Sequence, residues 1–202
     1  MSFTKVNLKE KTQKHNPSNL NGYKFNSALT AEQVDIYKYW IWKLRPHYSL
    51  LINEFHMYAG NPPYTHIDFL DFIDQEFGIS SSIIGYDPEE DFPVSGTWFW
   101  TGIPNDFVVY LNMSHPEVRR NVTVLHEAFH VIQDWDEEFK CMINEIPEDM
   151  QLKIVERIAE LSAIETVIPA HLIIKDKRDN LSPYAVAIKY GISVQMATIA
   201  LK

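Results

Sequence analysis

Apolar residues recur at helical spacing over the first part of the chain, and helix start and stop signals divide this part into three segments. A capping box at Thr30-Ala31-Glu32-Gln33 begins a helix that runs to about Arg45 and is stopped by Pro46. The pattern predicts a second helix over Ser49 to Tyr58, and a third that starts at Thr65 and is closed by Gly78. We expect residues 30–78 to form accessory helices that pack on the rest of the protein.

The middle of the chain changes to short runs rich in β-branched and aromatic residues. These runs predict strands at Ile79 to Ile84, Val94 to Trp100 and Phe107 to Leu111. The last two are separated by a turn-forming segment, which indicates an antiparallel hairpin. We therefore predict an α+β fold with a small, mostly antiparallel sheet.

A strongly amphipathic helix is predicted directly after the strands. Ser114 is the expected N-cap, with Pro116 in the first turn and Glu117 at the capping-box position. Apolar residues follow at spacings of 4, 3, 4 and 3, which is the period of one helix face: Val118, Val122, Leu125, Phe129 and Ile132.

This helix contains the string His126-Glu127-Ala128-Phe129-His130, which reads HExxH. Side chains four residues apart share one face of a helix, so both imidazoles can reach a single metal ion. Glu127 is then placed to hold a water molecule and take its proton. The motif and its helical context together predict a metal-dependent hydrolase.

A catalytic zinc ion usually takes three protein ligands, so one further ligand is needed. The single cysteine, Cys141, excludes a cysteine-rich site and an intramolecular disulfide, which leaves histidine and carboxylate. The next predicted helix, 148–166, carries Glu156 and Glu160 on one face together with small residues. Either glutamate can be the ligand, and the other would then accept a proton from a ligand imidazole.

Charge and hydropathy narrow the choice of partners and location. The formal net charge of -9 argues against nucleic-acid binding. The first 30 residues carry five lysines and one glutamate, so we expect residues 1–29 to form a basic, flexible arm. The sequence has no 18-residue apolar run and no signal-peptide pattern, so we expect a cytoplasmic protein with no membrane contact.

Residues 79–202 resemble the ImmA/IrrE family of zinc metallopeptidases. The similarity lies in the strand Phe107 to Leu111, Arg119-Arg120, Val122 to Leu125 directly before HEAFH, and Glu156-Arg157-Ile158-Ala159-Glu160 with Ala163. Farther on, Thr166 to Pro169 and the pair of predicted helices from Leu181 to Leu201 are similar to the family's closing elements. Phe129 is a departure, because the family commonly has glycine before the second histidine.

The resemblance implies a zincin-like core whose HExxH helix is joined by a second ligand helix. It implies His126, His130 and Glu156 as Zn²⁺ ligands and Glu127 as the general base, which leaves Glu160 in the supporting position. It also implies an endopeptidase whose protein substrate is a separate transcriptional repressor or similar regulator. Four residues are candidate donors to the reaction's oxyanion: His115, His171, Tyr184 and Tyr190.

A second function is compatible with the same residues. In that case the protein is a zinc-containing binding module, of antirepressor or toxin-antitoxin type, that sequesters a regulator without cutting it. A purely structural zinc site has no need for a carboxylate at Glu127, so that residue favours the peptidase.

Overall fold

The structure, a computed structural model, describes residues 29–87 and 94–201. The basic arm predicted for residues 1–29 therefore lies, except for Leu29, outside the described residues. The described part has an α+β fold of eight helices and one sheet. In chain order the elements are α2 (Ala31–Ala59), α3 (His66–Phe77), β1 (Ser80–Tyr86), β2 (Gly96–Trp100), β3 (Asp106–Asn112), α4 (Glu117–Trp135), α5 (Glu137–Asn144), α6 (Glu148–Val167), α7 (Ala170–Arg178), α8 (Pro183–Tyr190) and α9 (Val194–Ala200).

The sheet has the strand order β1-β3-β2 and is mixed. Strand β2 pairs with β3 in antiparallel fashion from Gly96 opposite Leu111 to Trp100 opposite Phe107, as the hairpin prediction expected. Strand β1 pairs with β3 in parallel along its whole length, so the expectation of a mostly antiparallel sheet is wrong. The local sequence indicates where the strands are but not which of them pair or in which direction. In the structure β1 lies next to β3 rather than next to β2, and it runs parallel to β3.

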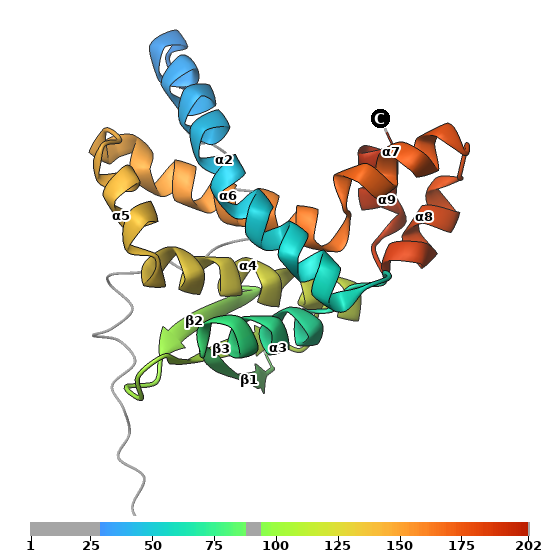
Figure 1. Cartoon of the computed structure of the whole chain (residues 1–202), viewed down its shortest axis with the longest axis horizontal. Coiled ribbons are helices and arrows are strands. Elements are labelled where there is room, and N and C mark those ends of the chain that lie inside the picture. Colours follow the sequence, from blue (N-terminus) through green and yellow to red (C-terminus); the bar gives the residue numbers. More distant parts are fainter. Residues whose placement is uncertain (1–28, 88–93, 202) are drawn as a thin grey trace, which may run out of the picture.

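Helix α4 lies across the centre of the molecule, with the sheet on one side and α6 and α2 on the other (Figure 1). It begins at Glu117 with Pro116 in the N-cap position, and not at Ser114 as expected. The Ser114 hydroxyl instead donates to the Asn112 side chain at 2.7 Å, which occupies it in the turn after β3. This central position brings α4 into contact with α6, α3, α5 and the strands β2 and β3.

Helix α2 is one continuous helix, whereas the sequence predicted two helices separated at Pro46. Proline removes one backbone hydrogen bond and crowds the preceding turn, which normally ends or bends a helix. Here Leu44, Tyr48 and Ile52 are almost fully buried on both sides of Pro46, so packing against the core holds the helical backbone through it. The capping boxes predicted at Thr30 and Thr65 are both present.

Phe129 explains how the accessory helices attach to the core. Its side chain is fully buried on the face of α4 that meets α2 and α3, with ring centroids 5.9 Å from Tyr48 and 5.0 Å from Phe69. The bulky residue that departs from the family pattern is therefore part of a packed aromatic core. Cys141 is exposed on α5. Among the described residues, no helix is both long and apolar enough to cross a membrane.

Candidate metal centre

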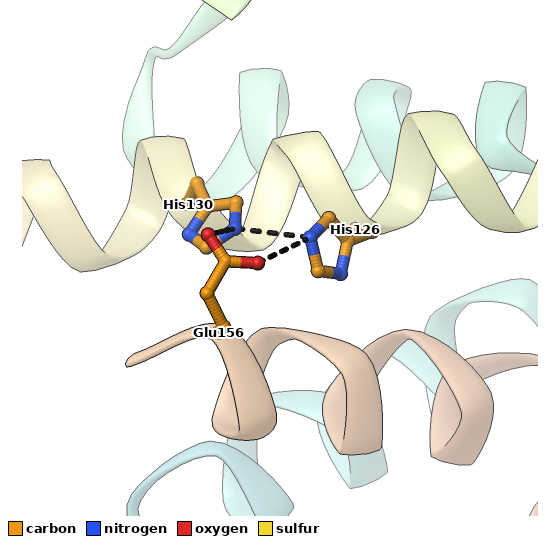
Figure 2. Close-up of side chains that lie close together, drawn as sticks. All are labelled: His126, His130 and Glu156. Atoms are coloured by element: carbon orange, nitrogen blue, oxygen red, sulfur yellow. Dashed lines mark hydrogen bonds and ion pairs between the residues drawn. The ribbon is translucent and has the colours of Figure 1, made fainter. Parts of the chain in front are cut away.

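Three side chains from two helices converge at the contact between α4 and α6. His126 and His130 project from successive turns of α4 toward Glu156 of α6 (Figure 2). The two imidazole Nε2 atoms lie 3.0 Å apart. Each Nε2 also lies 3.5 Å from a different oxygen of the Glu156 carboxylate. This His-His-Glu group could hold a metal ion.

Burial separates the group from bulk water. The side chains of His126, His130 and Glu156 are 3%, 10% and 17% exposed. Burying a carboxylate and two imidazoles is costly unless they are paired or bind a cation. Two small residues of α6, Ala159 and Ala163, are both fully buried.

The pKa values within the group show how strongly its members interact. Burial alone would raise the pKa of Glu156, but hydrogen bonds and charge attraction from the two imidazoles outweigh it and lower the pKa to about 2. Burial alone would lower the pKa of His130, but its contacts with Glu156 and the nearby Glu127 carboxylate outweigh it, and the pKa is raised. Glu156 is thus held in its ionised form, which is the form that binds a cation.

Gln133 supports both helices of the site, and the sequence analysis missed it. Its side-chain oxygen lies 2.8 Å from Nδ1 of His130 and can accept the proton on that nitrogen, an arrangement that directs Nε2 toward Glu156. Its amide nitrogen donates to the carbonyl of Val155, the residue before Glu156, at 3.2 Å. One buried side chain therefore orients one candidate ligand and fixes the backbone beside another.

Glu160 does not contact an imidazole in the described structure. Its carboxylate accepts a hydrogen bond from Arg157 at 2.6 Å, and its side chain is 44% exposed. The role predicted for Glu160, accepting a proton from a ligand imidazole, belongs to Gln133 instead. The Nδ1 atom of His126 is buried without a hydrogen-bond partner among the described residues, and so is the hydroxyl of Thr123, one turn earlier on α4.

Glu127 lies on the side of α4 that faces the sheet. It is 2% exposed, and a methyl group built on Gly96, the first residue of β2, would lie 3.6 Å from its Cγ. That same methyl group would lie 2.6 Å from the Thr123 side chain, so only glycine allows β2 to approach α4 this closely. Burial, and next the Glu127 charge, raise the pKa of Tyr86.

The four candidate oxyanion donors occupy different parts of the fold. His115 lies near the start of β2, where its Nε2 is 3.2 Å from the hydroxyl of Ser95, and Arg119 donates to the same hydroxyl at 2.8 Å. Tyr190 donates to Asp176 at 2.6 Å, and Tyr184 is 68% exposed. His171 packs near His56, with ring centroids 6.4 Å apart. His115 therefore contacts the residue directly before Gly96, the glycine of β2 that adjoins Glu127.

Comparisons with known proteins bear on the fold. No family model matches the chain, and no curated protein matches it in sequence. A solved structure described as a Mycobacterium tuberculosis transcriptional regulator is similar, with a TM-score of 0.56 at 9% sequence identity. The match covers 81% of this chain and 49% of that chain, so this chain spans about half the length of that regulator. At this identity the likeness supports the fold alone.

Proposed function

We propose that this protein is a zinc-dependent endopeptidase resembling the ImmA/IrrE proteins and that it cleaves a separate transcriptional regulator. The observation that carries the proposal is the buried His126, His130 and Glu156 group with Glu127 on the same helix, next to the start of β2. A site that only stabilised the fold would not need a buried carboxylate at Glu127.

The donor set and its spacing favour zinc. Two imidazole nitrogens and one carboxylate are a common set of protein ligands for catalytic zinc. Tetrahedral ligands at a bond length of about 2.1 Å lie about 3.4 Å from one another. The two distances of 3.5 Å and the one of 3.0 Å between the ligand atoms are close to this value. Small shifts of the side chains would therefore complete the site.

The residues around the group have separate tasks in hydrolysis. When bound, zinc polarises the substrate carbonyl and lowers the pKa of a water molecule. Glu127 takes a proton from the attacking water and passes it to the leaving amine; it is buried, and its charge acts on His130. Gln133, through its contact with Nδ1 of His130, would hold that ring so that Nε2 could bind the ion.

The position of β2 favours a polypeptide substrate. This strand is at one end of the sheet order, so one of its edges is not paired with another strand of the described sheet. An extended segment can add to such an edge through main-chain hydrogen bonds. Because Gly96 of β2 adjoins Glu127, a segment bound there would pass close to the general base. The similar structure described as a transcriptional regulator is compatible with a regulatory setting but does not identify the substrate.

The alternative is a zinc-containing module that binds a regulator without cutting it. The peptidase and the binding module are distinguished by comparing the wild type with Glu127→Gln in cells that express the protein. We expect Glu127→Gln to retain near one zinc per chain, to copurify with an intact regulator, and to produce no new peptide termini. The wild type should produce new termini in that regulator, detected by terminal labelling and mass spectrometry. An intact regulator bound equally by both proteins would establish the module and exclude the peptidase.

A further inference from the structure

The long helix α2 carries a line of large apolar side chains on the face that points away from the core. Tyr39, Trp42, Leu50 and Met57 are 52%, 73%, 70% and 77% exposed. Together with the exposed Pro46 they follow spacings of 3, 4, 4 and 7 residues, which is one line along a helix. We call these five residues the α2 stripe.

The opposite face of α2 already provides its contact with the core. That face buries Trp40, Leu44, Tyr48, Ile52 and Phe55. The stripe is therefore a second apolar face, and it accounts for the aromatic residues of this helix that the core does not use. Trp42 lies beside Tyr39, with ring centroids 6.3 Å apart, so the two form a continuous aromatic surface.

The apolar area that the α2 stripe exposes is comparable to the largest patches on ordinary monomers. If a fully exposed side chain has an area of about 200 Å², then Tyr39, Trp42, Leu50 and Met57 together expose roughly 550 Å². This is near the upper end of the largest apolar patch on an ordinary monomer, about 300–600 Å². Single exposed apolar residues are common, but the largest apolar patch on a monomer is often functional.

We propose that the α2 stripe pairs two copies of this protein through an antiparallel contact between their α2 helices. A two-fold axis through the midpoint of the stripe, near residue 48, places Tyr39 against the partner's Met57 and Leu50 against the partner's Pro46. The same register places Trp42 against the partner's Glu54, so apolar contacts at the ends and centre alternate with contacts to the stem of a glutamate, and both copies use the same patch, as a two-fold interface requires. Two copies would bury roughly 1,100 Å², which reaches the size of about 1,000 Å² expected for a specific interface.

The first test is the mass of the full-length protein in solution. We expect sedimentation between about 1 and 100 µM to show a dimer of the 23.5 kDa chain, at the affinity typical of a small interface. Trp42→Glu should weaken this dimer at least tenfold. Tyr184→Glu makes the same kind of change at a residue that is 68% exposed on α8, and it should leave the dimer unchanged. A monomeric wild type at all concentrations, or equal dimers in both variants, would overturn the proposal.

The second test distinguishes an antiparallel pair from any other arrangement. In a Cys141→Ser background, Ser49→Cys lies near the proposed axis, and Asp35→Cys lies near the start of α2. With a rise of 1.5 Å per residue, the two copies of residue 49 are offset by only about 3 Å along the helices, but those of residue 35 by about 39 Å. A short bismaleimide should therefore link Ser49→Cys into dimers and leave Asp35→Cys unlinked. Linkage of both variants, or of neither, would contradict the antiparallel pair.

Discussion

Gln133 offers the sharpest test of how the candidate metal centre is organised. Its oxygen accepts from Nδ1 of His130 at 2.8 Å, and its nitrogen donates to the carbonyl of Val155 at 3.2 Å. Gln133→Met keeps a similar length and removes both hydrogen bonds. Gln133→Glu keeps an acceptor for His130 but places a second acceptor against the Val155 carbonyl. The two variants therefore separate the orientation of the ligand from the attachment of α6.

The expected magnitude follows from these contacts. Residues that orient a metal ligand typically contribute a factor of 10–100 in metal affinity, or about 1.4–2.7 kcal/mol. Gln133→Met should therefore weaken zinc binding by about 10- to 100-fold. Gln133→Glu should retain affinity within about threefold of the wild type, because a carboxylate accepts the imidazole proton at least as well as an amide. Both variants should lose stability, since each leaves the Val155 carbonyl without its donor.

Zinc affinity is best measured by competition with a chromophoric chelator, and stability by urea unfolding of the metal-free protein. Gln151→Met is the matched control, because Gln151 donates to the Ile146 carbonyl at 3.0 Å outside the site. We expect it to leave zinc affinity unchanged. Equal zinc affinity of Gln133→Met and the wild type would refute the orienting role. Equal weakening by Gln133→Met and Gln133→Glu would show that Gln133 acts only by attaching α6.

The other predictions concern the ligand set and the C-terminal helices. Glu156→Ala should lose most bound zinc while Glu160→Ala retains near one per chain, because only Glu156 contacts both imidazoles; elemental analysis giving the reverse order would reassign the ligand. Asp176 of α7 is 2% exposed and accepts from Lys189 and Tyr190 of α8, each at 2.6 Å, so Asp176→Asn should lower the free energy of unfolding by about 3 kcal/mol. Burial opposes ionisation of Asp176, but these hydrogen bonds outweigh it and lower its pKa, so its contribution is complete above about pH 4 and is lost as the pH falls through the lowered pKa. In urea unfolding, the free energy of unfolding should therefore fall more steeply with decreasing pH for the wild type than for Asp176→Asn. The same pH dependence in both proteins would contradict this account.

The sequence by itself determined the local features of this protein. Capping boxes at Thr30 and Thr65 are formed by residues three positions apart, so they could be predicted without knowing the fold. The same holds for His126 and His130, because a spacing of four on a helix brings two side chains to one face wherever the helix lies. The hairpin of β2 and β3 was likewise predictable from adjacent segments.

Only the tertiary structure decided the features that depend on distant segments. Glu156 and Glu160 share a face of α6, and the position at which α6 crosses α4 determines that Glu156 meets the imidazoles. The same crossing brings Gln133 to the carbonyl of Val155. The parallel pairing of β1 and the continuation of α2 through Pro46 also depend on packing, which outweighs the local signals there. Sequence spacing specifies which side chains share an element, but the contact between elements is set by burial of the whole core.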